Sequence, residues 1–447
     1  MKKVLIKNAK IVNEGKITEG DVFIEDGIIK EISESISAKS PDVQIFDAEG
    51  THLLPGIIDD QVHFREPGLT HKEDIEMGSR AAVAGGITSF IEMPNTLPQT
   101  TTIEELEKKF QLAAEKSYAN YSFMFGGTND NLEEILKVDP TKTAALKLFL
   151  GSSTGNMLVD DQKVLEEIFS KSPLLIAVHC EDETTIQNNL KECVERYGDD
   201  IPIELHPKIR SEEACYKSSS NAVKLAKKTG ARLHVFHVST AKELELFSNK
   251  KLLKDKKITA EVCIHHLWFN DHDYKQKGTF IKWNPAVKSE KDQEALMKAL
   301  NDDILDVVAT DHAPHTKQEK QNPYTKAPSG GPLVQHALPA MLQFYHKEKI
   351  SLEKIVEKMC HNPAILFDIK DRGYIRVGYK ADLVLVDLNA PWQVKSDNIL
   401  YKCGWSPFEG VTFKSRITHT FVNGRLVYKN FKHQPFAKVA QQLEFDR

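Results

Sequence analysis

The chain has 447 residues, 40% of them apolar, and a formal net charge of −5 at pH 7, which predicts a globular protein with one large and one smaller domain. No basic excess points to nucleic acid, and no run of about 18 apolar residues predicts a membrane span. Six cysteines without a C-x-x-C pair favour a reduced, cytoplasmic protein, and the basic start MKKVLIK lacks the pattern of a signal peptide.

Both ends of the chain are rich in short predicted strands. In residues 1–54, Asp26-Gly27 is typical of a two-residue hairpin turn between strands. After residue 370 the same pattern of short strands and turns returns, and Asn423-Gly424 is a second hairpin signal. The sequence therefore predicts one small β-domain built from residues 1–54 and 370–447.

The middle of the chain, residues 55–369, alternates eight short apolar runs with amphipathic segments. Residues 102–117 and 240–254 are two of the predicted helices. Eight strands, most followed by a helix, predict an α/β protein whose main domain is a closed (β/α)8 barrel. The alternative is an open doubly wound sheet, which would need a reversal of strand order.

Polar side chains gather at the carboxyl ends of the predicted strands. In order along the chain they are His63, Asn95, Lys147, His179, His237 and Asp311. A single histidine at the end of an apolar strand is more often a buried structural residue. In a barrel, however, all these strand ends meet on the rim that carries the active site. Three imidazoles, a carboxylate and a lysine on one rim therefore predict a metal-dependent enzyme.

Lys147 lies within the apolar run AALKLFL, so burial should lower the pKa of its ammonium group. The neutral amine could react with CO2 and become a carbamate that bridges two metal ions. The alternative is a lysine paired with a carboxylate inside the barrel. Imidazole and carboxylate ligands together suit Zn2+, which activates water by lowering its pKa.

The remaining polar residues fit an anionic substrate. Asp311 could bind the metal and take a proton from the attacking water. Arg65 offers a fork of donors for a carboxylate, and Asn95 could add another donor. Asn284 and His315 lie in loops that could reach the substrate, and the glycine-rich loop 328–336 could lie against its ring.

Several motifs together resemble the dihydroorotases of the amidohydrolase superfamily. They include PGIIDDQVHFREPG, EMPNT, AVHCED, HVST, NPAV and ATDHAPH, and they extend over nearly the whole chain. The resemblance implies a zinc-dependent (β/α)8 barrel with a small β-domain. The implied reaction is the reversible cyclisation of N-carbamoyl-L-aspartate to L-dihydroorotate. The resemblance also implies a homodimer, and an association with aspartate transcarbamoylase is open.

The resemblance assigns a role to each candidate residue. The metal ligands would be His63 at the first ion, Lys147 as a carboxylated bridge, His179 and His237 at the second ion, and Asp311, which is also the general acid/base. The substrate would be held by Arg65, Asn95, His315 and Asn284.

The sequence departs from the family pattern at Gln61, where a metal-binding histidine is usual. A glutamine oxygen is a weaker zinc ligand, so we expect one firmly held ion at His179 and His237 and a second, weaker site. Strand alternation points Asp60 away from the metal unless the strand bulges, and Asp59 is expected to lie behind the ligands.

Two other functions are compatible with these motifs. One is a related hydrolase of the allantoinase or dihydropyrimidinase type, in which an uncharged ring would leave Arg65 unexplained. The other is a catalytically inactive scaffold for aspartate transcarbamoylase, which the loss of the histidine at Gln61 would fit. Retention of every other candidate residue favours an active enzyme.

Overall fold

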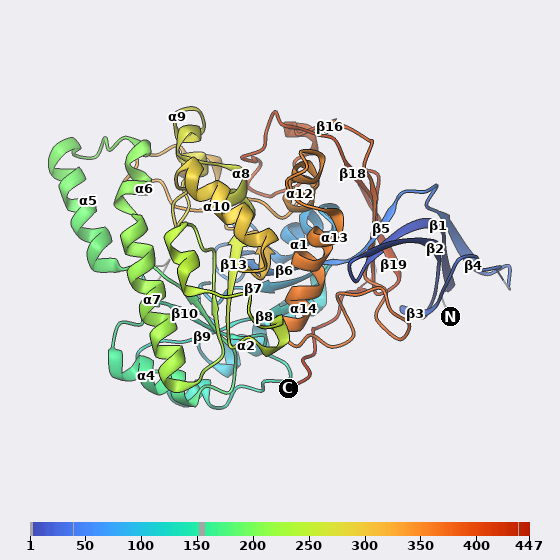
Figure 1. Ribbon diagram of the computed structural model, residues 1–447, viewed down its shortest axis with the longest axis horizontal. Coiled ribbons are helices and arrows are strands. Elements are labelled where there is room, and N and C mark those ends of the chain that lie inside the picture. The colour runs from blue at the N-terminus through green and yellow to red at the C-terminus, as the bar shows by residue number, and fades with distance from the viewer. Residues whose placement is uncertain (1–2, 39, 152–156, 437) are drawn as a thin grey trace.

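The computed structural model describes residues 3–38, 40–151, 157–436 and 438–447. A barrel surrounded by helices occupies most of the molecule, and a large β-sheet lies beside it (Figure 1). The N-terminus belongs to this sheet, whereas the C-terminus returns to the barrel.

The barrel is built from parallel strands whose spatial order follows the sequence. They are β6 (Ile57–Val62), β7 (Ile87–Glu92), β8 (Asn120–Phe123), β9 (Phe125–Gly126), β10 (Leu146–Phe149), β11 (Ile176–His179), β12 (Leu233–Val235), β13 (Ile258–Cys263) and β14 (Val307–Ala309). Segments β8 and β9 share the third position. A parallel bridge between Val62 and His312 joins the last strand to the first. The predicted (β/α)8 barrel is therefore confirmed, and no reversal of strand order supports the doubly wound alternative.

Helices on the outside of the barrel follow most strands. The longest are α1 (Ile75–Ala84), α2 (Ile103–Lys116), α4 (Gln162–Lys171), α5 (Glu183–Tyr197), α7 (Glu212–Thr229), α10 (Glu290–Asn301) and α12 (Ala337–His346). The helix predicted within residues 102–117 is confirmed as α2. Its N-cap is Thr102, whose side chain accepts from the Glu105 amide, and it buries Leu106 and Ala113 against the barrel.

The helix predicted at residues 240–254 is wrong. This segment contains only two short 3-10 turns, Lys242–Leu246 and Leu253–Asp255. Between them, the Asn249 amide donates to the carbonyl oxygen of Asp302 at 2.7 Å. Serine and threonine side chains that bond nearby backbone groups compete with helix formation, and here the Ser248 hydroxyl accepts from the Lys250 amide at 3.2 Å.

The sheet beside the barrel combines both ends of the chain. Its strands are β1 (Lys3–Asn13), β2 (Lys16–Glu25), β3 (Ile28–Ser33), β4 (Val43–Asp47), β5 (His52–Pro55), β15 (Leu383–Asp387), β18 (Arg416–Val422), β19 (Arg425–Lys429) and β20 (Lys432–His433). Strands β5 and β15 pair in its middle. The composite β-domain is therefore confirmed.

Both predicted hairpin turns are present in this sheet. Asp26 and Gly27 connect β2 to β3 with φ angles of 51° and 80°, and Asn423 and Gly424 connect β18 to β19 with 48° and 71°. Positive φ at both central positions is what a type I′ turn requires, and Asn-Gly and Asp-Gly adopt it most readily.

The end of the chain leaves this sheet and packs against the barrel. The Leu443 amide donates to the Tyr121 carbonyl, and Leu443 and Phe445 are buried among barrel residues such as Ala177 and Val307. The tail thereby covers apolar surface at one side of the barrel.

Candidate active site

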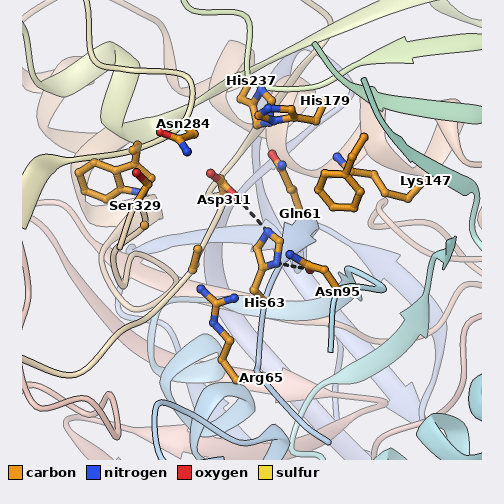
Figure 2. Close-up of a pocket in the computed structure, with 14 residues that line it drawn as sticks. Gln61, His63, Arg65, Asn95, Lys147, His179, His237, Asn284, Asp311 and Ser329 are labelled. Atoms are coloured by element: carbon orange, nitrogen blue, oxygen red, sulfur yellow. Dashed lines mark hydrogen bonds and ion pairs between the residues drawn. The ribbon is translucent and has the colours of Figure 1, made fainter. Parts of the chain in front are cut away.

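A cavity lies at the carboxyl ends of the barrel strands and collects most of the residues predicted from the sequence (Figure 2). Its described lining consists of Gln61, His63, Arg65, Asn95, Lys147, Phe149, His179, His237, Trp283, Asn284, Asp311, Ala313, Ser329 and Gly330. Every candidate residue except His315 is in this set. Residues from positions 61 to 330 meet here because parallel strands all end on the same rim.

His63 connects two other candidate residues. Its Nδ1 atom lies 2.8 Å from Asn95 Oδ1, and its Nε2 atom lies 3.1 Å from Asp311 Oδ1 (Figure 2). Since the amide oxygen can only accept, Nδ1 carries the hydrogen and Nε2 presents a lone pair or a second hydrogen to the carboxylate. Burial lowers the pKa of His63 well below its ordinary value, so the neutral ring with an available Nε2 is favoured.

Burial also controls the protonation of Asp311. It raises the pKa of this carboxyl group to about 7, although Lys147, His179 and Arg65 each lower it. A carboxyl group with a pKa near neutrality can both accept and return a proton during a reaction.

His179 and His237 turn their rings toward each other, with His179 Nδ1 and His237 Nε2 only 3.0 Å apart. On its other side, His179 Nε2 lies 3.1 Å from Glu181 Oε2. Burial alone would raise the pKa of Glu181, but Arg210 and His179 lower it to about 2, so the carboxylate is charged and accepts. A hydrogen on His179 Nε2 leaves the Nδ1 lone pair in the cavity, as in histidines that bind metals.

Three of these residues have an unusual backbone conformation. Arg65, His237 and Asp311 have φ angles of 64°, 38° and 48°. Residues with a side chain rarely adopt positive φ, and such strain persists where the surrounding structure holds it. Each of the three follows a barrel strand, so the turn directs its side chain into the cavity.

Lys147 is fully buried in β10, as its apolar strand predicts. Burial lowers the pKa of its ammonium group to about 7, against the opposing effects of Asp311 and Glu261. Its Nζ atom lies 4.0 Å from the ring centre of Phe236 and 4.9 Å from that of Phe149. Burial therefore favours the neutral amine that a carbamate requires.

Strand β6 contains a bulge at the position where the sequence departs from the family pattern. Asp59 pairs with Phe90 and Val62 with Glu92, so one extra residue is accommodated between them. Gln61 reaches the cavity, where Cys263 Sγ donates to its Oε1 atom at 3.5 Å. Asp59 lies behind the cavity and accepts from the Thr310 hydroxyl at 2.7 Å.

The bulge also changes the position of Asp60. This side chain turns toward His234 and Glu261 in the barrel interior and is not among the residues lining the cavity. Asp60 therefore points away from the predicted metal ligands of the cavity, as alternation predicts, although the bulge places it inside the barrel.

Arg65 and His315 form the opposite side of the site. Lys72 donates to His315 Nδ1 at 2.9 Å, which leaves the hydrogen on Nε2 for the Ser329 carbonyl at 3.0 Å. Arg65 Nη2 lies 3.1 Å from the same Nε2 atom, which then offers it no acceptor. Among the described residues, His315 therefore stands behind Arg65 and not in the cavity wall.

Asn284 lies in the cavity wall with an unmet acceptor. Its Oδ1 atom is buried and has no hydrogen-bond partner among the described residues, and the same holds for Nε1 of the adjacent Trp283. Buried polar atoms normally have partners, so these two are available to a ligand.

Sequence reasoning missed some of the lining. Phe149, Trp283 and Ala313 were not singled out, although each is within two residues of a candidate that was. Ser329 and Gly330 belong to the loop 328–336 that was expected to meet the substrate. Polar residues inside apolar strands were the available signal for Asp60, His234 and Glu261, which form a separate cluster.

Comparison with known proteins identifies the family of the chain. The model of the protein family described as "Amidohydrolase family" matches residues 52–427 of the chain. A dihydroorotase of Carboxydothermus hydrogenoformans is 36% identical and covers 95% of this chain and 98% of its own. A dihydroorotase of Methanosarcina mazei is 34% identical, covering 92% and 91%.

Among solved structures, an L-hydantoinase (dihydropyrimidinase) of Arthrobacter aurescens has a TM-score of 0.93 and 29% identity, and covers 99% of this chain and 100% of its own. A dihydropyrimidinase of Brevibacillus agri, at a TM-score of 0.88 and 24% identity, covers 100% of both chains and shows the shared fold. The chain belongs to the amidohydrolase family and is an enzyme of the cyclic amide hydrolase type. Across the described segments, no helix is long and apolar enough to cross a membrane.

Proposed function

We propose that this enzyme is a dihydroorotase, which interconverts N-carbamoyl-L-aspartate and L-dihydroorotate. The observation that carries the proposal is Arg65, whose buried guanidinium lines the same cavity as the histidines and Asp311. A buried cation needs an anionic partner, and dihydroorotate has a carboxylate of the matching planar shape. The resemblance to curated dihydroorotases over most of the chain supports the same substrate.

The donor set of the cavity fits a divalent metal ion. His179 Nδ1 and His237 Nε2 converge, and His63, Asp311 and Lys147 line the same space. Nitrogen and carboxylate donors of this kind suit Zn2+, and we propose that a carboxylated Lys147 adds a further oxygen ligand. When bound, the ion supplies a Lewis acid and a water of lowered pKa.

The residues of the chain then divide the chemistry between them. Asp311 accepts the proton of the attacking water and passes it to the ring nitrogen as the amide bond breaks. Arg65 and Asn95 orient the substrate carboxylate, and Asn284 contributes its amide to the ring. The Pro314 carbonyl accepts from Arg65 Nε at 3.1 Å and orients the guanidinium, and Glu181 holds the His179 ring in the required tautomer.

A hydantoinase or dihydropyrimidinase is the second candidate, because of the structural similarity to the Arthrobacter aurescens enzyme. The hydantoin and dihydropyrimidine rings that such enzymes would hydrolyse carry no carboxylate at the position that Arg65 would contact. Homodimer formation and association with aspartate transcarbamoylase stay predictions from the resemblance.

The test is turnover of L-dihydroorotate by zinc-supplied protein, with hydantoin, dihydrouracil and allantoin as parallel substrates. Preference for dihydroorotate is expected. Preference for a neutral ring would overturn the proposal that dihydroorotate is the substrate and that Arg65 binds its carboxylate. No turnover of any ring by folded, metal-containing protein would favour the inactive scaffold.

A further inference from the structure

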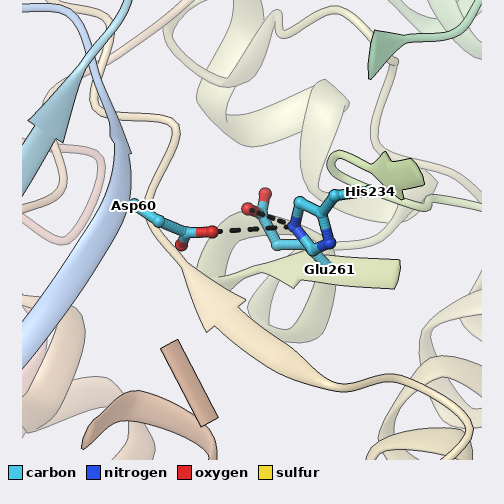
Figure 3. A group of neighbouring side chains, drawn as sticks. All are labelled: Asp60, His234 and Glu261. Carbon is cyan, nitrogen blue, oxygen red and sulfur yellow. Dashed lines mark ion pairs between the residues drawn. The ribbon is translucent and has the colours of Figure 1, made fainter. Parts of the chain in front are cut away.

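A second group of potential metal ligands lies inside the barrel, separate from those that line the cavity (Figure 3). Asp60 of β6, His234 of β12 and Glu261 of β13 each turn one ligand atom toward the others, and these atoms lie within 4.8 Å of one another. All three side chains are 0% exposed. Cys263 Sγ contacts both Glu261 and Gln61, so the group lies directly behind the cavity wall.

The spacing of these atoms is unlike that of hydrogen-bonded partners. His234 Nε2 lies 3.6 Å from Asp60 Oδ2 and 3.6 Å from Glu261 Oε2. A hydrogen bond between nitrogen and oxygen needs about 2.7–3.2 Å. Ligands held tetrahedrally at about 2.0–2.2 Å from Zn2+ lie about 3.4 Å from one another. The two histidine–carboxylate separations are therefore close to those of atoms that share one ion, and the third pair lies within 4.8 Å.

The other ring nitrogen of His234 indicates which tautomer is present. Nδ1 lies 2.9 Å from Thr259 Oγ1, and this hydroxyl already donates to the Leu233 carbonyl at 3.2 Å. The hydroxyl oxygen must accept from His234, so the hydrogen is on Nδ1. Burial lowers the pKa of His234, but Asp60 and Glu261 raise it to about 9, so without a metal Nε2 carries a second hydrogen toward the two carboxylates. A bound ion would take the place of that hydrogen. Metal-binding histidines show this arrangement, with the far N–H held by a second group.

In the part of the chain that the structure describes, His234 and the two carboxylates form only ion pairs at 3.6 Å with one another, and this spacing leaves several of their polar atoms without hydrogen bonds. Both oxygens of Asp60, Oε2 of Glu261 and Nε2 of His234 are buried without a hydrogen-bond partner among the described residues. Buried carboxylates are costly unless paired or bound to a metal. One divalent ion would neutralise both carboxylates and satisfy the lone pair of His234 at once.

We propose that Asp60, His234 and Glu261 bind a divalent metal ion of the zinc class, at a site distinct from the cavity. The ion joins β6 to β12 and β13 across the barrel interior and so stabilises the folded chain. Gln61 and Cys263 separate the two sites. The proposed role of this interior ion is structural. The ion does not contact the substrate of the reaction in the cavity.

The direct test is anomalous scattering from crystals grown with Zn2+, measured on both sides of the zinc absorption edge. The expected result is a peak within about 2.3 Å of Asp60, His234 and Glu261, besides any peak in the cavity. Peaks in the cavity alone would overturn the proposal. So would His234 hydrogen-bonded to either carboxylate at less than about 3.2 Å with no peak between them.

Variants supply an independent test by metal analysis of the purified protein. Asp60→Asn and Glu261→Gln keep the side-chain shape but remove a charged ligand, and each should lose about one zinc ion per chain relative to wild type. Glu243→Gln is the matched control, because Glu243 is an equally buried carboxylate whose oxygens are held by Ser219 and Thr240. It should keep the wild-type metal content.

Unchanged zinc in a folded Asp60→Asn protein would refute the site. If both ligand variants fail to fold, the wild-type anomalous map decides. Neither readout depends on turnover, so a protein that lacks dihydroorotase activity can still show the interior ion, and an active enzyme can lack it.

Discussion

His179 Nδ1 and His237 Nε2 lie 3.0 Å apart, while the opposite nitrogen of His179 is held by the charged Glu181. Two rings from different strands thus present ring nitrogens to one point in the cavity. Burial lowers the pKa of His237 well below its ordinary value, so repulsion between two imidazolium ions is avoided. With the His179 hydrogen on Nε2, the His237 Nε2–H donates to His179 Nδ1, and a bound metal ion would take the place of that shared hydrogen. This pair is the part of the cavity best prepared for a metal ion.

Replacement of Lys147 tests the proposed carbamate. Lys147→Ala should lower zinc affinity by at least about tenfold and abolish turnover, since a bridging ligand is lost. Lys147→Arg is the matched control, because arginine keeps the positive charge but forms no carbamate. We expect it to behave like Lys147→Ala. If it instead retains wild-type zinc content, the lysine acts as a cation beside Asp311 and the carbamate is wrong.

Replacement of Arg65 tests the substrate carboxylate. Arg65→Met should raise KM for dihydroorotate by about 10–100-fold, because charge-assisted hydrogen bonds to the anion contribute about 1.5–3 kcal/mol. The change in kcat should be smaller. Steady-state kinetics with dihydroorotate and with neutral dihydrouracil would measure the difference.

Lys72→Met is the control for Arg65, since Lys72 is a neighbouring cation that contacts His315 and does not line the cavity. Its effect on KM should be several-fold weaker. Equal effects of the two variants would mean that general positive charge, and not the Arg65 fork, attracts the substrate.

The departure at Gln61 can be reversed. Gln61→His should raise the occupancy of the ion near His63, because imidazole binds zinc more tightly than a neutral amide oxygen. Metal analysis after dialysis against limiting zinc would show a higher metal-to-chain ratio than in wild type. Gln61→Asn should show no gain, and an unchanged ratio in the histidine variant would contradict this account of the site.

Glu181 predicts a defined dependence of stability on pH. Its pKa falls from an ordinary 4.5 to about 2 in the folded protein, so its stabilisation is complete above pH 4.5 and is lost as pH falls toward 2. The shift corresponds to about 3 kcal/mol.

Glu181→Gln should therefore lower the free energy of unfolding at pH 7, and the difference from wild type should shrink as pH falls from 4.5 to 2. Urea denaturation of wild type and variant at several pH values measures the loss at pH 7 and its change with pH. A difference that stays constant down to pH 2 would show that the carboxylate is not the stabilising group.

Much of the fold and site follows from local sequence patterns. Asn423-Gly424 and Asp26-Gly27 form the predicted hairpins because asparagine, aspartate and glycine adopt positive φ more readily than other residues. His63, Lys147 and His179 meet because each lies at or near the carboxyl end of a barrel strand, and this position can be read from apolar runs.

The tertiary structure decided what local patterns do not encode. A bulge in β6, set by pairing with β7, turned Asp60 inward toward His234 and Glu261. Residues 240–254 form two short 3-10 turns in place of the predicted helix, and between them the Asn249 side chain contacts the Asp302 carbonyl of a distant segment. The sequence by itself determined which side chains lie at strand ends, because this depends on residue order alone. The distances between side chains of different strands depend on register and packing, so only the tertiary structure decided them.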